Sequence, residues 1–364
     1  MFIKDIALNN FRNYSEGSVE FAPGINILYG ENAQGKTNIL EALYMIATTK
    51  SHRESHDREI IKFDQTEGHI RAQMEKSGVS HRIDMHLKKA GNKGIAIDMI
   101  PVKRSAELIG LMSVVFFSPE DLSIVKNGPA ERRRFVDMEL CQLSRIYFNN
   151  LSNYNKVLSQ RNNLLKQIYF DKSKMDTLPV WDLQLVEYGK KIIEEREKFI
   201  ALINEIIPVI HSDITGGKEK LRVEYVKNTD VDCFEDNLAS KLDTELKLSS
   251  TQTGPHRDDL RFVVNDIDVR KYGSQGQQRT AALSLKLAEI ELVKRMSNDD
   301  PVLLLDDVMS ELDSGRRDAL MEKIRDIQTI ITCTGYDDFI KKRIKLDRIY
   351  RVVSGTVMLE TGTY

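Results

Sequence analysis

The chain has 364 residues, of which 41% are hydrophobic and 30% are charged, so it can bury a substantial core in one large domain or two lobes. Its 53 lysines and arginines against 55 aspartates and glutamates give a net charge of −2, so any nucleic-acid surface must be a local patch. Asp5 stands where a signal peptide requires apolar residues, and no apolar run approaches the ~20 residues of a membrane span, so we expect a cytoplasmic protein.

The beginning of the chain predicts β structure. Apolar residues interrupted by polar ones are typical of short strands at residues 3–8 and 19–21, and they lead into an apolar strand at residues 25–29. After a glycine-rich loop, Ile39, Leu40 and Leu43 recur at helical spacing. We therefore expect a strand, a loop and a helix in succession.

The glycine-rich loop fits the phosphate-binding pattern at every required position. Its residues are Gly30, Glu31, Asn32, Ala33, Gln34, Gly35, Lys36 and Thr37. Glycines allow successive backbone N–H groups to point at phosphates, and the helix that follows adds its positive N-terminal end. Lys36 would reach the β- and γ-phosphates of a nucleotide, and Thr37 would place its hydroxyl on Mg²⁺. A glycine-rich turn that matches by chance is the alternative interpretation.

The middle of the chain predicts a change from sheet to helix. Alternating segments between residues 68 and 102 are typical of antiparallel strands, with turns at Gly78 and at residues 90–92. From residue 130 to about residue 210, apolar residues recur at helical intervals, in a region too short and too irregular for a long coiled-coil arm. Strand character returns at residues 259–264.

Two later segments are expected to complete the nucleotide site together with the phosphate loop. Residues 301–305 form an apolar run that ends in Asp306 and Asp307. A central parallel strand here would place Asp306 at its carboxyl end, beside Thr37, as the metal partner, while Asp307 would face the attacking water. Upstream, Ser274 is placed like a helix N-cap in the sequence Ser-Gln-Gly-Gln. A strand that merely ends in solvated acids is the alternative for the first segment.

The order of these motifs resembles that of ATPase heads of the ABC class and, more narrowly, that of the RecF family. The segments that carry the resemblance are residues 9–14, 30–37, 51–53, 118–122, 128–137, 254–260 and 306–313. The resemblance implies an α/β fold, a two-lobed ABC-type ATPase head with a β-rich N-terminal part and a helical insertion. The core would comprise residues 1–118 and 254–364, and a mainly helical second lobe, residues 119–253, would be inserted in it.

The resemblance also implies an ATP site shared between two chains. In this class two ATP molecules lie between two heads, so Ser274, Gly276 and Gln277 of one subunit would meet the γ-phosphate held by the other. ATP and Mg²⁺ are therefore the implied cofactors, and a homodimer that forms on ATP binding is the implied assembly. Lys36 and Ser274 would act in catalysis together with Asp307-activated water.

Two further expectations concern the surroundings of the nucleotide. By resemblance, Arg12 and Asn13 would lie near its phosphates or sugar, although a solvated loop position is the alternative. The wider class usually has Glu at the position of Asp307 and His after the following strand, whereas residues 329–334 offer hydroxyls but no imidazole. We therefore expect slow turnover, with ATP acting as a clamp timer rather than as fuel for a motor.

The RecF resemblance implies a function in recombinational DNA repair. Such a protein would bind duplex DNA near single-strand gaps, help RecO and RecR load RecA, and be released by weak, DNA-stimulated ATP hydrolysis. The basic residues that could contact DNA are Lys50, Arg53, Arg58, Lys88, Lys89, Lys93, Lys103 and Arg104. Ordinary solvated charges are the alternative for each of them. The rival function is a phosphate-loop kinase or a nuclease-associated ATPase acting on another substrate.

Overall fold

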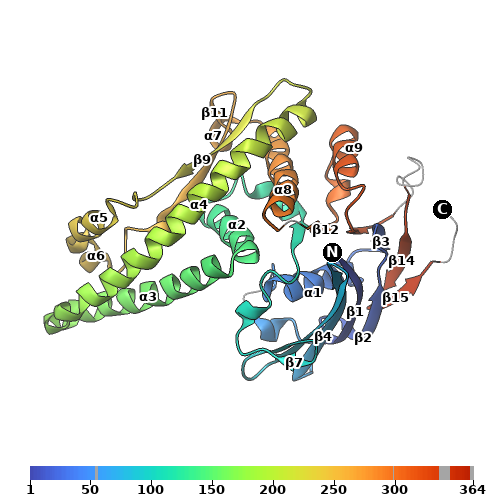
Figure 1. The fold of residues 1–364 in the computed structure, drawn as a ribbon, viewed down its shortest axis with the longest axis horizontal. Helices are drawn as coiled ribbons and strands as arrows, with labels where there is room; N and C mark the ends of the chain where they lie inside the picture. Colours follow the sequence, from blue (N-terminus) through green and yellow to red (C-terminus); the bar gives the residue numbers. More distant parts are fainter. Residues whose placement is uncertain (54–55, 298, 336–344, 361–364) are drawn as a thin grey trace. The chain divides into compact units, whose positions relative to one another are not determined.

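The computed structural model describes residues 1–53, 56–297, 299–335 and 345–360. The chain divides into two compact units (Figure 1). Unit 1 comprises Met1–Asp121 and Lys286–Tyr364, and unit 2 comprises Leu122–Leu285. Each unit has its own sheet structure and its own core.

The N-terminal part of unit 1 is an antiparallel sheet of six strands in the order β2-β1-β4-β5-β6-β7. Its strands are β1 (Phe2–Phe11), β2 (Tyr14–Glu20), β4 (Glu67–Lys76), β5 (Val79–Lys88), β6 (Gly94–Ile97) and β7 (Ile100–Pro101). Alternate residues of β4, such as Ile70, Ala72 and Met74, are buried, because one face of the sheet covers the core and the other meets water. The strands predicted between residues 68 and 102 are therefore confirmed.

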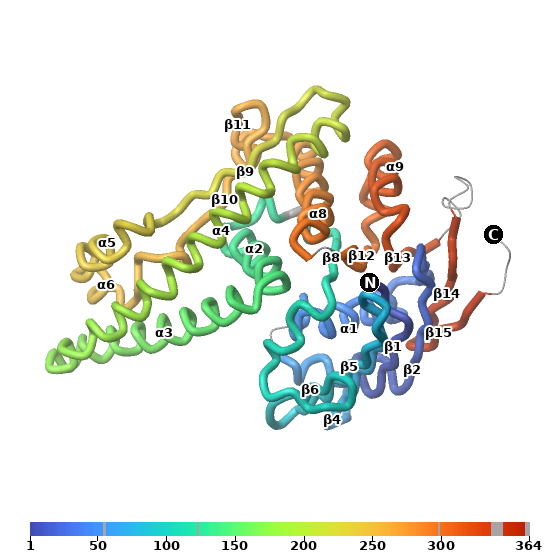
Figure 2. The backbone as a smooth tube through the Cα atoms, in the orientation of Figure 1, coloured from blue at the N-terminus to red at the C-terminus, as the bar shows by residue number. Residues whose placement is uncertain are grey.

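The second sheet of unit 1 is mainly parallel and has the order β15-β14-β3-β13-β12-β8. Its strands are β3 (Ile25–Tyr29), β8 (Val114–Phe117), β12 (Val302–Asp306), β13 (Thr329–Cys333), β14 (Arg348–Val353) and β15 (Thr356–Leu359). Figure 2 shows that strands from opposite ends of the sequence meet here, since β3 pairs in parallel with both β13 and β14. All residues of β12 are buried, as expected for a central parallel strand.

Helix α1 (Lys36–Thr48) contacts both sheets of unit 1, because it lies against β1 and β4 of the first and against β8, β12 and β13 of the second. Ten of its thirteen residues are buried, so its position is determined by packing on two sides. Gln328, just before β13, also joins the two sheets: its Nε2 donates to the carbonyl of Ile3 at 2.8 Å, and its Oε1 accepts from the N–H of Ile3 at 2.7 Å. Because α1 packs against both sheets, the helix that follows the phosphate loop is held in a defined position.

Unit 2 is built around the long helices α3 (Arg145–Phe170) and α4 (Leu178–Thr215), which lie side by side (Figure 1). Ser144 caps α3, since its side chain accepts a hydrogen bond from the N–H of Tyr147 at 3.1 Å. A three-stranded antiparallel sheet, in the order β11-β10-β9, completes the unit. The other elements are α2 (Pro129–Leu143), α5 (Phe234–Ser240), α6 (Leu242–Leu248), α7 (Val269–Tyr272), β9 (Leu221–Val226), β10 (Asp259–Val264) and β11 (Ile267–Asp268).

The division into units differs from the predicted domain boundaries. The predicted second lobe ended at residue 253, whereas residues 254–285 belong to unit 2, because β10 pairs with β9 there. Helix α8 (Gln275–Ser297) crosses the boundary between residues 285 and 286, and α9 (Ser314–Lys323) lies in unit 1.

Short 3₁₀ helices occur at η1 (Asp57–Glu59), η2 (Ser105–Glu107), η3 (Pro119–Ser123), η4 (Lys172–Thr177), η5 (Pro255–Arg257) and η6 (Val308–Ser310). Among the described residues, no helix has the length and apolar character needed to cross a membrane.

Candidate nucleotide site

The phosphate loop, residues 30–37, connects β3 to α1. Gly30 and Gly35 have φ angles of 153° and 113°, which side chains rarely allow. A Cβ atom on Gly30 would lie 2.4 Å from the carbonyl oxygen of Val352, and one on Gly35 would lie 2.7 Å from Nδ2 of Asn13. Neither glycine can be replaced without moving the loop or its neighbours.

Two outside segments brace the loop at Gln34. The carbonyl oxygen of Gln34 accepts hydrogen bonds from Asn13 Nδ2 at 2.9 Å and from the N–H of Gly355 at 3.0 Å. The Gln34 side-chain oxygen accepts from the N–H of Ser354 at 2.6 Å. Asn13 Oδ1 accepts from Asn38 Nδ2 at 2.8 Å, which ties the loop to the first turn of α1. Residues near both ends of the chain therefore hold the loop.

Arg12 precedes Asn13 but is anchored to α1 rather than to the loop. Its guanidinium donates two hydrogen bonds, of 2.7 and 2.8 Å, to the carboxylate of Glu41, which is fully buried. Ser51 Oγ donates to the same carboxylate at 2.5 Å. Burial opposes the ionisation of Glu41, but the hydrogen bonds from Arg12 and Ser51 outweigh it and hold the pKa of Glu41 below its usual value. Of the two residues predicted near the nucleotide, Asn13 is hydrogen-bonded to the loop itself and Arg12 to Glu41 of α1.

Lys36 is the first residue of α1 and is almost completely buried. Its Nζ donates to the carbonyl oxygens of Gly30 at 2.6 Å and of Glu31 at 2.7 Å. Burial lowers the pKa of Lys36, while the nearby carboxylates of Asp307 and Asp306 oppose that shift. The ammonium group thus lies against the loop backbone and within the field of the acidic end of β12.

Asp306 ends β12 and is buried. Its Oδ1 accepts hydrogen bonds from Thr37 Oγ1 at 2.8 Å and from Thr332 Oγ1 at 2.7 Å. Burial raises the pKa of Asp306 despite these bonds, and the charges of Glu120 and Asp307 raise it further. The structure thus brings together Thr37 and Asp306, the two residues assigned to the metal. Hydroxyl and carboxylate oxygens crowded by further carboxylates are a donor set that fits Mg²⁺.

Glu120 is an acidic residue near this site; it lies in the segment 118–122, which carries part of the family resemblance, but the sequence did not assign it to the site. It follows β8, which pairs in parallel with β12 so that Phe117 lies opposite Leu305. The carboxyl ends of the two strands therefore lie at one edge of the sheet. Polar residues directly after the apolar strand β8 were the available signal, but the pairing of β8 with β12 could not be deduced from that signal alone.

Asp307 follows β12 with a left-handed φ of 54°. Such conformations are uncommon outside glycine and are found at functional sites. Its backbone N–H donates to the carbonyl oxygen of Thr332 at 3.2 Å, and its own carbonyl accepts from Ser310 Oγ at 2.7 Å. Burial raises the pKa of the Asp307 carboxyl and Lys36 opposes this shift. The turn therefore fixes a carboxylate within electrostatic reach of Lys36.

The Ser-Gln-Gly-Gln segment, residues 274–277, begins α8 within unit 2. Ser274 Oγ accepts a hydrogen bond from the N–H of Gln277 at 3.2 Å, and Gln277 Oε1 accepts from the N–H of Ser274 at 3.0 Å. This reciprocal cap confirms the predicted N-cap position of Ser274. Ser274 is exposed, whereas Gly276 and Gln277 are half-buried. Because Oγ acts as an acceptor in the cap, the Ser274 hydroxyl can still donate its proton outward.

The residues predicted to contact DNA all lie in unit 1, and their environments differ. Lys93 is engaged within the protein: its Nζ donates to the carbonyl oxygen of Thr49 and pairs with Asp57 at 2.8 Å. This pairing argues against Lys93 as a DNA contact. Lys88 is half-buried. The exposed residues are Lys50, Arg53, Arg58, Lys89, Lys103 and Arg104.

Two of the segments that carry the family resemblance form an ionic network inside unit 2. Arg132 is buried and donates to the Asp259 carboxylate through hydrogen bonds of 2.6 and 3.0 Å. Arg133 donates to the carbonyl oxygen of Asp258 at 2.7 Å. The Asp258 side chain is itself buried and pairs with Arg196 at 3.0 Å. These residues hold α2, α4 and the start of β10 together.

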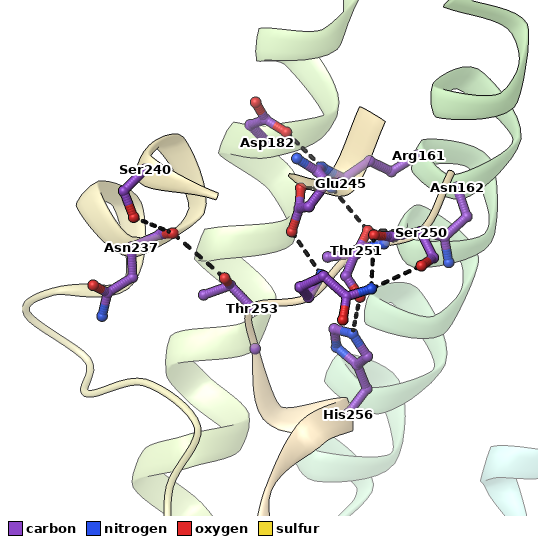
Figure 3. A network of polar contacts seen from close by, with 12 residues as sticks. Arg161, Asn162, Asp182, Asn237, Ser240, Glu245, Ser250, Thr251, Thr253 and His256 are labelled. Atoms are coloured by element: carbon purple, nitrogen blue, oxygen red, sulfur yellow. Dashed lines mark hydrogen bonds and ion pairs between the residues drawn. The ribbon is translucent and has the colours of Figure 1, made fainter. Parts of the chain in front are cut away.

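A second buried network, drawn in Figure 3, centres on Arg161 of α3. Arg161 is fully buried and donates to Asp182 at 2.6 Å and to Thr251 Oγ1 at 2.8 Å. It also pairs with the buried Glu245 at 2.6 Å. The network joins α3, α4 and α6 to the segment before η5, so it stabilises the body of unit 2.

His256 borders this network, and burial lowers its pKa to about 4. Its Nε2 faces the carbonyl of Thr251 at 3.1 Å, which can only accept, so Nε2 carries the proton and Nδ1 accepts from Tyr154 at 2.7 Å. Because the folded pKa lies below the ordinary value of about 6.5, the unfolded chain binds the proton first as the pH falls. We expect up to about 2 kcal/mol of stability to be lost through His256 between pH 7 and pH 5.

Denaturant unfolding at pH 7 and pH 5 checks this expectation, with His256→Gln as the comparison. The Gln variant lacks the titrating ring, so it loses less stability on acidification than the parent. An equal loss in both proteins would show that another group is responsible.

The strand, loop and helix around Lys36, the carboxylate at the end of β12 and the capped Ser274 turn define an ATPase head of the ABC class. The family model for the RecF/RecN/SMC N terminal domain matches residues 2–357. The chain belongs to the RecF family. It is 60% identical over 357 residues to the DNA replication and repair protein RecF of Lachnoclostridium phytofermentans, with 98% of this chain and 99% of that protein covered. It is 57% identical to that of Agathobacter rectalis over the same shares.

Solved structures show the same relationship in three dimensions. A structure of the recombination mediator protein RecF with ATP, from the RecFOR pathway, matches with a TM-score of 0.92 and 36% identity, covering 99% of this chain and 98% of that one. An Smc head bound to the C-winged helix domain of ScpA matches with a TM-score of 0.58 at 14% identity, which shows the shared fold alone. The predicted fold, an α/β ABC-type ATPase head, is therefore confirmed.

Proposed function

We propose that this chain is an ATP-dependent DNA-binding protein of recombinational repair, which dimerises on ATP and binds duplex DNA near single-strand gaps. There it helps RecO and RecR load RecA. The observation that supports the proposal is that one chain carries both a phosphate loop and a capped, exposed serine turn, which fit the two halves of a composite ATP site. The phosphate loop and Asp306 lie in unit 1, and the capped, exposed Ser274 lies in unit 2. Relatives named DNA replication and repair protein RecF, and a RecF structure with ATP, support it.

The residues of unit 1 bind the phosphates of the nucleotide. Backbone N–H groups of the loop and the N-terminus of α1 face the phosphate oxygens, and Lys36 exchanges the loop carbonyls for the β- and γ-phosphates. Thr37 and Asp306 would hold Mg²⁺, which would supply positive charge to stabilise the phosphates. A cation there would also offset burial and the repulsion from Glu120 and Asp307, which together raise the pKa of Asp306.

The residues of unit 2 close the site from a second copy of the chain. The Ser274 hydroxyl and the N-terminus of α8, including Gly276, donate to the γ-phosphate, since a helix N-terminus favours an added anion. The contact is lost when the γ-phosphate leaves. ATP binding therefore holds the dimer together, and hydrolysis sets how long it lasts.

Asp307 is assigned as the residue that accepts a proton from the attacking water. We expect Asp307→Asn to lower hydrolysis by about 10²-fold or more, because the amide cannot accept that proton. The ATP-induced dimer should persist, since Asn keeps the shape and the turn. Phosphate release and sedimentation with ATP measure the two properties separately. Glu322→Gln on the exposed face of α9 is a matched control.

An Asp307→Asn variant that hydrolyses ATP at the parent rate would remove Asp307 from the chemistry. A parent turnover of tens per second would contradict the timer role.

Sedimentation with and without ATP, and with and without gapped duplex DNA, tests the proposal as a whole. We expect a monomer without ATP, a dimer with ATP, and a DNA complex whose affinity falls steeply with salt, because the exposed basic residues of unit 1 contact phosphates rather than bases. A monomer indifferent to ATP would favour the rival kinase-like or nuclease-associated function.

A further inference from the structure

The signature turn, residues 274–277, is connected to the buried end of α4 by a chain of side-chain contacts within unit 2. Gln277 Nε2 donates to Glu219 Oε1 at 2.9 Å. Glu219 Oε2 lies 3.2 Å from Nε2 of His211, and Nδ1 of His211 lies 2.9 Å from Ser284 Oγ. This series of contacts thus begins at Gln277 of α8 and ends at Ser284 of the same helix, about two turns later.

The backbone places Glu219 where it can join these elements. Helix α4 ends at Thr215 and is capped by Gly216, which has a φ of 62°; Gly217 follows with a φ of 77°. The N–H of Gly217 donates to the carbonyl oxygen of Ser212 at 2.8 Å, so the chain turns sharply after the helix. Glu219 therefore comes back beside His211, in the last turns of α4, just before β9 begins.

Burial changes steadily along this chain of contacts. His211 and Ser284 are fully buried, Glu219 and Gln277 are half-buried, and Ser274 is exposed. Burial lowers the pKa of His211 although Glu219 opposes the shift, so the ring is neutral at pH 7. A carboxylate can only accept, so Nε2 of His211 carries the proton toward Glu219. The single proton of the Ser284 hydroxyl is then shared between two acceptors, Nδ1 of His211 and the carbonyl oxygen of Thr280. The exposed Ser274 is thus connected, through Gln277 and Glu219, to the buried residues His211 and Ser284.

Gln277 connects the cap at Ser274 to Glu219, because the oxygen and the nitrogen of its side-chain amide have different partners. The amide oxygen accepts from the N–H of Ser274, and the amide nitrogen donates to Glu219. Without Glu219 the nitrogen loses its acceptor, and the amide can rotate away from the cap. The order of the cap therefore depends on a residue outside α8.

We propose that Glu219 and His211 are positioning residues for the signature turn: they hold Gln277 in the orientation that caps Ser274, so that the Ser274 hydroxyl is ordered before it meets ATP bound to a second copy of this chain. This inference rests on the ATP-induced dimer proposed above. Ordering a side chain in advance removes its entropic cost at the moment of association. The resulting increase in affinity therefore affects dimerisation and not the binding of ATP to a single chain.

Glu219→Ala tests the positioning role. We expect the ATP concentration for half-maximal dimerisation, measured by sedimentation, to rise about three- to tenfold. Binding of a fluorescent ATP analogue to the dilute monomer should not change, because the phosphate loop lies in unit 1. Glu187→Ala, at an exposed position of α4, is the matched control and should behave like the parent.

Glu219→Gln separates positioning from a general loss of stability. Its amide oxygen can accept from Gln277, and its amide nitrogen can donate to Nε2 of His211 if the ring takes the other neutral tautomer. Ser284 Oγ then accepts from Nδ1, and its single proton goes wholly to the carbonyl of Thr280, which lies 2.8 Å away. We therefore expect Glu219→Gln to restore most of the dimerisation.

Parent-like dimerisation of Glu219→Ala, or an equal loss in Glu219→Gln, would overturn the positioning role while the proposed function stands. A parent protein that fails to dimerise with ATP would instead overturn the proposed function and this inference with it.

Discussion

Lys36→Arg is expected to lower ATP hydrolysis by about 10²-fold or more and to abolish the ATP-induced dimer. Lys36 is almost completely buried, and its Nζ lies within 2.7 Å of two loop carbonyls. A planar guanidinium is larger than the compact ammonium and cannot take its place in the loop. Phosphate release at saturating ATP and sedimentation with and without ATP measure the two losses.

Lys4→Arg is the matched control for this variant, because Lys4 lies at the surface of the same unit and pairs with Glu75. It should leave hydrolysis and assembly unchanged. If Lys36→Arg dimerises and holds gapped DNA with ATP as well as the parent does, the proposed coupling of nucleotide, dimer and DNA is wrong.

Arg196→Met is expected to cost unit 2 about 3–5 kcal/mol of stability, because it leaves buried carboxylates without their cation. Arg196 donates to Asp258 at 3.0 Å, to Asp137 at 2.8 Å, to the carbonyl of Pro255 at 2.8 Å and to the Tyr147 hydroxyl at 3.1 Å. Methionine fills part of the volume but supplies none of these donors. Denaturant unfolding of parent and variant at pH 7 measures the loss.

The pH dependence of this loss identifies its origin. Burial already raises the pKa of Asp258 although Arg196 opposes it, so removing Arg196 raises that pKa further. The variant should therefore regain part of its stability relative to the parent as the pH falls and Asp258 is protonated. Arg222→Met removes a half-exposed arginine of the same unit and is the control. A loss no larger than in that control would show that the buried network contributes little.

Much of the candidate nucleotide site could be predicted from the sequence because the pattern that it requires is local. The phosphate loop requires glycines and a lysine at fixed spacing between a strand and a helix, and all of these lie within residues 25–48. The approach of Asp306 to Thr37 could be predicted although they are far apart in the sequence, because parallel strands present their carboxyl ends at one edge. The cap at Ser274 followed from residue type and position alone.

Other features could not be predicted because they depend on which strands are neighbours. The sequence does not say that β13 lies between β3 and β12, so the hydrogen bond from Thr332 to Asp306 was unforeseen. Glu120 was missed for the same reason. The assignment of β10 to unit 2 depends on its pairing with β9, a strand that was not predicted. Lys93 was predicted as a possible DNA contact because its pairing with Asp57 could not be deduced from the sequence.

The bracing of Gln34 by Ser354 and Gly355 has a consequence for synthesis of the protein on the ribosome. The phosphate loop emerges long before the residues that brace it, because Ser354 follows Gln34 by 320 residues. Strand β3 likewise pairs with the much later strands β13 and β14. Unit 2, in contrast, is one continuous segment, Leu122–Leu285, so it can fold while unit 1 is still incomplete. A nascent chain can therefore fold unit 2 first, whereas its phosphate loop is braced only after Ser354 and Gly355 have been made.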